Sequence, residues 1–118
     1  MRTISRRQKR VSEQIRHELS TLLKREARDP RLAEVTITEV QVSPDLRQAQ
    51  IYVSGLGDRQ QILRALASAS SYLRRHLAER LALRLVPEVR FRWDDSLERG
   101  QRILELLHGL EGEGKKDE

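Results

Sequence analysis

Cysteine is absent from this chain of 118 residues, and aromatic residues are scarce. Without cysteine there can be no disulfide framework, no thiolate metal site and no cysteine nucleophile. The four aromatic residues, Tyr52, Tyr72, Phe91 and Trp93, give poor support for a platform that stacks single-stranded bases. No apolar run approaches membrane-spanning length, and no apolar signal core follows the basic first residues. We therefore expect a cytoplasmic protein with no membrane partner.

The composition indicates one small domain beneath a large charged surface. Hydrophobic residues make up 37% of the chain and charged residues 35%, which is respectively low and high for a globular domain. At this length a single domain is expected, and we place it at residues 1–108. Residues 109–118, rich in glycine and charge, are expected to form a disordered tail.

Charge is distributed unevenly along the chain. Residues 1–28 carry nine Lys or Arg against three Glu, and residues 59–92 carry eight against two acidic residues, so each segment has a net charge of +6. Residues 29–58 carry −3 and residues 93–118 carry −4. Of the 23 basic residues 19 are arginine, whose planar guanidinium suits phosphate better than the lysine ammonium does. The pattern predicts a nucleic-acid partner.

Apolar spacing predicts amphipathic helices in both basic segments. The first is expected from about Ser5 to Arg28, ending before Asp29-Pro30 because a residue that precedes proline avoids helical geometry. The second begins at Asp58, a capping residue, and the small, weakly helix-forming residues 67–71 favour a kink in its middle. A short final helix is expected around residues 97–107. The two long stripes consist of Ile4, Val11, Ile15, Leu19 and Leu22, and of Ile62, Leu66, Ala69, Leu73, Leu77 and Leu81.

Alternating residues predict three strands, at about 35–42, 49–54 and 89–93. Within the first strand, Ile37 and Val40 are out of phase, so we expect a bulge at Thr38-Glu39. A turn at residues 43–46 makes the first two strands a hairpin. In the third strand Phe91 and Trp93 should face the core.

These elements predict an α+β fold of order α-β-β-α-(kink)-α-β with a short terminal helix. Three strands cannot bury both faces of a sheet, so we expect a two-layer sandwich with the helices on one face. The other face would be open and would carry Gln48, Gln50, Arg90 and Arg92.

No catalytic constellation is recognisable in the sequence. Asp94-Asp95 is an adjacent acidic pair, but neighbours on a strand point to opposite faces, and capping of the last helix explains the pair better. His17, His76 and His108 have no metal-ligand spacing. We therefore expect a binding protein rather than an enzyme, without cofactor, metal or small-molecule substrate. A metal-dependent nuclease that uses Asp94 and Asp95, and an adaptor that binds proteins, are the rival hypotheses.

The order of the elements resembles a KH-like domain of the bacterial type (type II). A more specific resemblance, from about Arg6 to Leu107, is to the ribosome-binding factor A family. The residues that carry it are Arg7, Arg10-Val11, Ile15, Glu18-Leu19, Asp29-Pro30-Arg31-Leu32, Val35-Thr36-Ile37-Thr38, Val40, Val42-Ser43, Asp45-Leu46, Ala49, Ile51-Tyr52-Val53-Ser54, Leu73-Arg74, Leu83-Arg84, Pro87, Phe91 and Asp94. The family's Ala-x-Gly kink corresponds here to Ala69-Ser70-Ser71, with serine in place of the glycine.

The resemblance implies a monomeric, non-catalytic assembly factor that binds the free small (30S) ribosomal subunit and its 16S rRNA. It implies a role late in rRNA maturation and in growth in the cold. A general KH-like module for messenger or small RNA is the alternative. Charge and position on the helical wheel suggest which residues would contact RNA phosphates, and the serines at the kink would let the backbone approach the RNA. The candidates are Arg6, Arg7, Arg10, Arg64, Ser70, Ser71, Arg74, Arg75, Arg84, Arg90 and Arg92.

Overall fold

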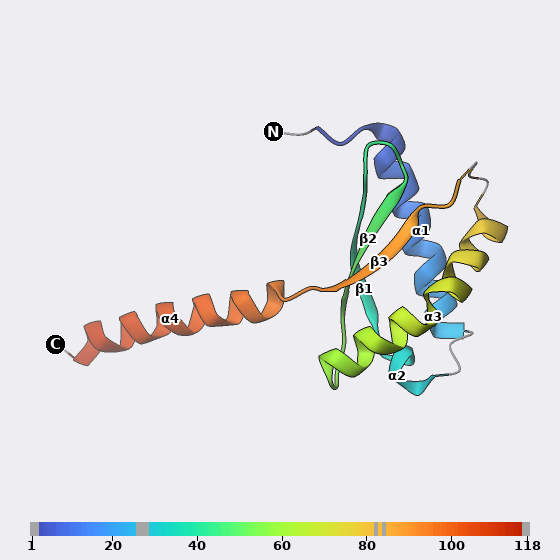
Figure 1. Ribbon diagram of the computed structural model, residues 1–118. Helices are drawn as coiled ribbons and strands as arrows, with labels where there is room; N and C mark the ends of the chain where they lie inside the picture. Colours follow the sequence, from blue (N-terminus) through green and yellow to red (C-terminus); the bar gives the residue numbers. More distant parts are fainter. Residues whose placement is uncertain (1–2, 26–28, 82, 84, 117–118) are drawn as a thin grey trace.

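The α+β sandwich that the sequence predicts is the fold of the chain. The computed structural model describes residues 3–25, 29–81, 83 and 85–116, except for the side chains of residue 97 and of residues 111–116. The helices α1 and α3 lie on one side of a three-stranded sheet (Figure 1). In chain order the elements are α1 (Arg6–Arg25), α2 (Pro30–Ala33), β1 (Thr36–Val42), β2 (Gln48–Ser54), α3 (Arg59–Arg80), β3 (Glu88–Trp93) and α4 (Ser96–Lys116).

The sheet is mixed and has the strand order β1-β2-β3. β1 and β2 form the antiparallel hairpin, whereas β3 runs parallel to β2 after the crossover through α3. In the central strand Ala49, Ile51 and Val53 are buried. Their neighbours across the parallel pair are Val89, Phe91 and Trp93, which pack against the core. One face of the sheet is thus apolar along all of β2 and β3.

The expected bulge in β1 is present. Ile37 pairs with Val53 and Glu39 pairs with Tyr52, so Thr38 is the extra residue. The insertion restores the phase of the strand, and Ile37, Val40 and Val42 are all buried. The freed Thr38 hydroxyl donates a hydrogen bond to the carboxylate of Asp94, just after β3. That contact joins β1 to the end of β3 across the width of the sheet.

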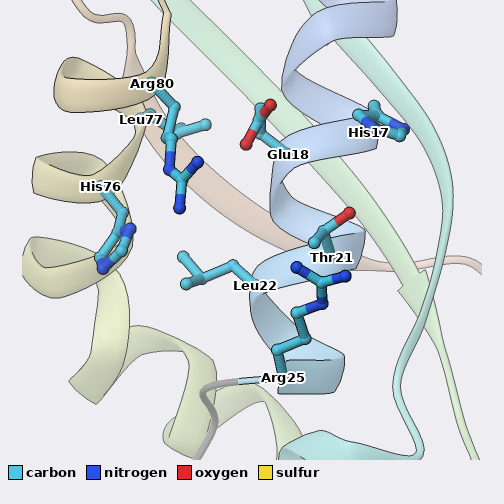
Figure 2. Close-up of a pocket in the computed structure, with 8 residues that line it drawn as sticks. All are labelled: His17, Glu18, Thr21, Leu22, Arg25, His76, Leu77 and Arg80. Atoms are coloured by element: carbon cyan, nitrogen blue, oxygen red, sulfur yellow. The ribbon is translucent and has the colours of Figure 1, made fainter.

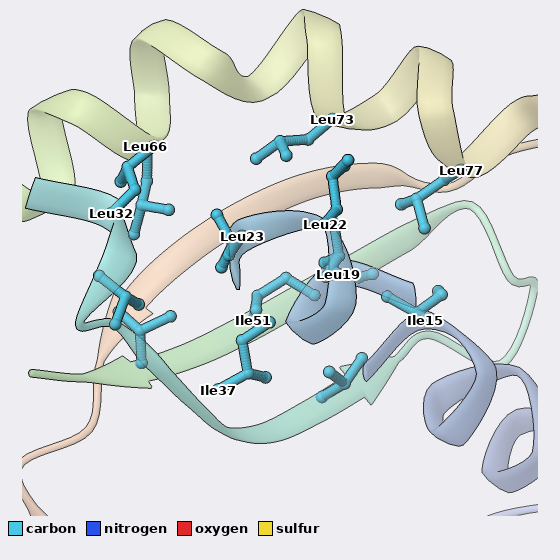
Figure 3. Close-up of a cluster of buried hydrophobic side chains, with 14 of the residues drawn as sticks. Ile15, Leu19, Leu22, Leu23, Leu32, Ile37, Ile51, Leu66, Leu73 and Leu77 are labelled. Atoms are coloured by element: carbon cyan, nitrogen blue, oxygen red, sulfur yellow. The ribbon is translucent and has the colours of Figure 1, made fainter. Parts of the chain in front are cut away.

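Leucine and isoleucine side chains from both long helices fill the space above the sheet (Figure 3). From α1, Ile15 and Leu19 are fully buried, and Leu66 of α3 is equally inaccessible. They meet Ile51 of the central strand in one continuous cluster. Burial of a side chain of this size stabilises the fold by about 1.5–3 kcal/mol, so the two stripes hold the helices on the sheet.

A capping box fixes the start of α1. The Gln8 N–H donates to Ser5 Oγ (3.1 Å), and the Ser5 N–H donates to Gln8 Oε1 (2.9 Å). Gln8 is also a buried polar residue, 8% exposed, and its Nε2 donates to the Val42 carbonyl (2.9 Å). One side chain therefore caps α1 and ties it to the end of β1.

The helix α2 is absent from the sequence-based prediction, which treated Asp29-Pro30 only as a stop. The Asp29 side chain accepts a hydrogen bond from the Arg31 N–H and forms an ion pair with its guanidinium. Pro30 occupies the first turn, where its missing N–H costs nothing. The single turn buries Leu32.

The helix α3 is continuous from Arg59 to Arg80. Asp58 caps it by accepting from the N–H groups of Gln60 and Gln61 (2.9 and 3.1 Å). Gly57, just before the cap, has a φ of 111°, a conformation that glycine adopts readily. The axis of α3 changes direction near its middle (Figure 1), but no break in the helix separates its two halves at Ala69-Ser70-Ser71.

The last helix is longer than expected. A short helix and a disordered tail from residue 109 were expected, whereas α4 spans Ser96–Lys116. Strong helix formers, leucine and glutamate above all, outweigh the glycines in this segment. α4 extends away from the sandwich (Figure 1), and Ile103, Leu106 and Leu110 are exposed. None of the described helices is both long and apolar enough to cross a membrane.

Replacement of Gln8 by alanine should destabilise the fold. The substitution removes the donor to the Val42 carbonyl and the acceptor for the Ser5 N–H, both in a part-buried or buried setting. We expect a loss of about 1–3 kcal/mol in the free energy of unfolding, measured by urea denaturation. Gln14→Ala, on the exposed side of the same helix, is the control and should change it by less than about 0.5 kcal/mol. Equal losses in the two variants would contradict the role assigned to Gln8.

The Asp94 carboxylate should make stability depend on pH. The Thr38 hydroxyl and then the Ser96 N–H, which donate to it, hold the pKa of Asp94 below its ordinary value. A lowered folded pKa stabilises the fold above the unfolded pKa, about 3.9, and that contribution is lost as the pH falls through the folded pKa. Asp94→Asn should therefore lower the free energy of unfolding at pH 7, and the deficit should shrink below about pH 4. In Glu13→Gln, an exposed position on α1, no such narrowing is expected.

Candidate nucleic-acid interface

The predicted arginines of α1 lie together on its first two turns. Arg6, Arg7 and Arg10 are all exposed, and within the described residues none of them lies within 4.0 Å of a carboxylate. The capping box at Ser5 fixes the backbone from which they project. These side chains are therefore free to meet phosphate groups in solvent.

Three residues of α3 that are predicted to contact RNA line one shallow hollow. Ser71, Arg74 and Arg75 line it, together with Val86, and its volume is about 300 Å³. Arg74 is partly committed to the fold, since its Nη2 donates to the Val86 carbonyl (3.3 Å). Arg75 is exposed. The hollow joins the middle of α3 to the segment before β3.

The remaining predicted residues of α3 flank this hollow. Ser70 is half-buried, and Arg64 is exposed. Arg64 lies seven residues before Ser71, so the two share a face of the helix. Arg84 lies outside the described residues, and its contact with RNA stays a prediction.

Arg90 and Arg92 lie on the other side of the molecule. Arg90 pairs with Gln50 and Arg92 with Tyr52 across the parallel strands, so both project from the open face, as expected. Arg90 is within 4.0 Å of Glu88. The helices cover the opposite face of the sheet (Figure 1). One rigid RNA helix cannot lie against the helical layer and the open sheet face at the same time. The structure thus separates the predicted arginines into a helical set and a sheet-face pair.

Two arginines that the sequence-based prediction omitted face a cleft between α1 and α3. Arg25 and Arg80 line it, from the last turns of the two helices (Figure 2). The prediction selected residues opposite the apolar stripes, whereas these two lie beside them. Arg25 follows the buried Leu22 by three residues, and Arg80 follows Leu77 by three. Position at the border of a stripe is the signal that could have identified them.

Acidic groups of the hairpin region keep their charge at neutral pH. The Arg31 guanidinium that hydrogen bonds to Asp29 lowers the pKa of that carboxyl. The Ser43 hydroxyl, followed by the Arg47 N–H, lowers the pKa of Asp45. Residues 29–58 therefore present net negative charge and disfavour contact with phosphate, which leaves the helices as the attractive surface.

The adjacent acidic residues Asp94 and Asp95 have partners within the fold. No group of three or more His, Cys, Asp or Glu among the described residues could hold a metal ion. The Asp94 carboxylate accepts hydrogen bonds from Thr38 and from the Ser96 N–H at the start of α4. Asp95 pairs with Arg99 one turn on (3.1 Å). The two carboxylates thus have separate structural partners.

Comparison with known proteins finds structures with a similar fold. The crystal structure of ribosome-binding factor A from Thermus thermophilus is similar, with a TM-score of 0.69, 28% identity, and coverage of 73% of this chain and 93% of that one. The solution structure of a Thermotoga maritima protein assigned as a ribosome binding factor A has a TM-score of 0.65 and 32% identity, covering 78% and 91%.

A third similar structure comes from a ribosomal complex. A homology model of Thermus thermophilus ribosome binding factor A, as fitted into the cryo-EM map of a 30S complex with that protein, has a TM-score of 0.60 and 25% identity, covering 79% of this chain and 97% of that one. The family described as ribosome-binding factor A matches residues 7–107. With this match over most of its length, the chain belongs to the ribosome-binding factor A family.

Proposed function

We propose that this protein binds the free small ribosomal subunit through its 16S rRNA during late maturation, assists processing of that rRNA and supports growth in the cold. The family match over residues 7–107 is the observation that carries the proposal. The similar Thermus thermophilus protein was fitted into a map of a 30S complex, which supports the same partner here. The protein acts as a cytoplasmic monomer without catalysis.

The distribution of charge supports RNA as the surface that is recognised. Arginines project from α1 and α3, while the hairpin between them is acidic. Phe91 and Trp93 pack against the core, which disfavours base stacking on their rings. Recognition therefore relies on phosphates and on the shape of a folded RNA, as is usual for structured RNA. Binding to one conformation of the rRNA stabilises it and keeps an immature subunit out of use.

Binding to purified small subunits should depend on the exposed arginines of α3. We expect the wild-type protein to sediment with free small subunits and not with translating ribosomes. Arg64→Gln with Arg75→Gln should weaken binding roughly tenfold or more, because each substitution removes a charged group that pairs with phosphate. The slope of log affinity against log salt should also fall by about one for each phosphate that is no longer neutralised.

Arg47→Gln is the matched control. It removes the same charge from an exposed position in the acidic hairpin, and affinity should stay within about twofold of the wild type, as for a residue outside the contact. Sedimentation with translating ribosomes alone, or a preference for short single-stranded RNA over subunits, would overturn the proposal. The second outcome would favour a general KH-like module for messenger or small RNA.

A further inference from the structure

The cleft between α1 and α3 has a volume of about 340 Å³, at the small end of the range for ligand sites. α1 contributes Glu18, Thr21 and Arg25, and α3 contributes Arg80 (Figure 2). Its apolar floor consists of Leu22 and Leu77, which are 7% and 1% exposed. The sides of the cleft are therefore polar, and its floor is part of the hydrophobic core.

The two guanidinium groups are available to a ligand. Arg25 and Arg80 are exposed, and among the residues that the structure describes neither has a carboxylate within 4.0 Å. Figure 2 shows the Arg80 guanidinium pointing into the space between the helices and the Arg25 guanidinium turned back toward Thr21. Two like charges that line one hollow repel each other and raise the positive potential within it. An anion placed between them relieves that repulsion.

Phosphate is the anion that fits these donors best. A guanidinium offers two parallel N–H donors, which match two oxygens of one phosphate. The Thr21 hydroxyl adds a further donor from the wall of α1. The apolar floor lowers the local dielectric and strengthens charge-assisted hydrogen bonds. Arg25 and Arg80, which are 55 residues apart in sequence, thus line one small cleft.

Glu18 opposes anion binding in the same cleft. Its carboxylate lies on the α3 side of α1, near Arg80 in the view of Figure 2. A carboxylate there repels a phosphate and reduces the net positive charge of the cleft. The two kinds of substitution should therefore change phosphate affinity in opposite directions. Neutralising Glu18 should tighten phosphate binding, and neutralising either arginine should weaken it.

We propose that the cleft between α1 and α3 is a phosphate-binding site that holds a backbone phosphodiester of the rRNA, through Arg25 and Arg80. The proposal rests on rRNA binding as the proposed function and adds a contact on the helical side of the molecule. It lies on neither the open sheet face nor the hollow around Ser71.

Three variants of the intact chain, each with a matched control, test the site against purified small subunits. Arg25→Gln and Arg80→Gln should each weaken binding roughly five- to tenfold, and each should lower the salt slope by about one. Glu18→Gln should tighten binding by about two- to fivefold. Glu13→Gln, which removes the same charge from an exposed position on α1, and Arg47→Gln in the hairpin should each stay within about twofold.

The outcomes separate this inference from the proposed function. If the wild type binds subunits and both arginine variants bind as tightly as Arg47→Gln, the cleft proposal is wrong and rRNA binding stands. If Glu18→Gln binds no better than Glu13→Gln, the proposal is also wrong. If the wild type fails to bind subunits at all, the proposed function itself fails. Circular dichroism and urea denaturation of every variant, with stability equal to the wild type, confirm that the changes act on binding.

A titration with inorganic phosphate distinguishes the source of the anion. Chemical shifts of the Arg25 and Arg80 side-chain N–H groups, followed by NMR, should move little at millimolar inorganic phosphate, since one free ion lacks the neighbouring contacts of an RNA. They should move strongly with a folded rRNA fragment. Saturation by inorganic phosphate with no response to RNA, or a response only to an acidic peptide, would overturn the assignment to rRNA.

Discussion

The phase of β1 is the constraint on which the rest of the structure depends. The sheet has one buried face, so every apolar residue of β1 must point to it, yet Ile37 and Val40 are three residues apart and would point oppositely in a regular strand. The bulge at Thr38 resolves the conflict. It places both side chains beneath α1 and α3 and frees the Thr38 hydroxyl for Asp94. The bulge that keeps the apolar residues of β1 in the core therefore also stabilises the end of β3, through the hydrogen bond from Thr38 to Asp94. The helix α4 begins just after this point.

A core on one side of a sheet gives the molecule two unlike surfaces. The helical layer carries the arginines of α1 and α3, whereas the open face carries glutamines and the pair Arg90 and Arg92. Between the basic helices in sequence lies the acidic segment 29–58, in which local hydrogen bonds lower the pKa values of Asp29 and Asp45. Under the proposed function, phosphate would be attracted to the helical layer and repelled by the acidic segment. The proposed orientation of binding therefore depends on the topology as much as on the net charge.

The features that the sequence predicts correctly are those decided by neighbours in the chain. Helical stripes, strand alternation, the Asp58 cap and the bulge at Thr38 all depend on residues a few positions apart. The prediction missed α2 because Asp29-Pro30 both ends one helix and caps the next turn. It shortened α4 because it gave the glycines of this segment more weight than leucine and glutamate. It missed the cleft because Arg25 and Arg80 become neighbours only when α1 packs against α3, which no local pattern encodes.

Arginines at the border of a stripe differ from those opposite it in their surroundings. Arg25 and Arg80 each lie one turn beyond a leucine that is almost wholly buried, so the core fixes the backbone from which they project. Their side chains also line a cleft, and an arginine side chain confined in a cleft loses less conformational freedom when it binds than one on an open helix face. Arg6, Arg7 and Arg10 serve long-range attraction better, since they are solvated and near the start of the chain's first helix. Under the proposed function the two groups would have different roles: Arg6, Arg7 and Arg10 would increase the rate of encounter, and Arg25 and Arg80 would orient the bound RNA.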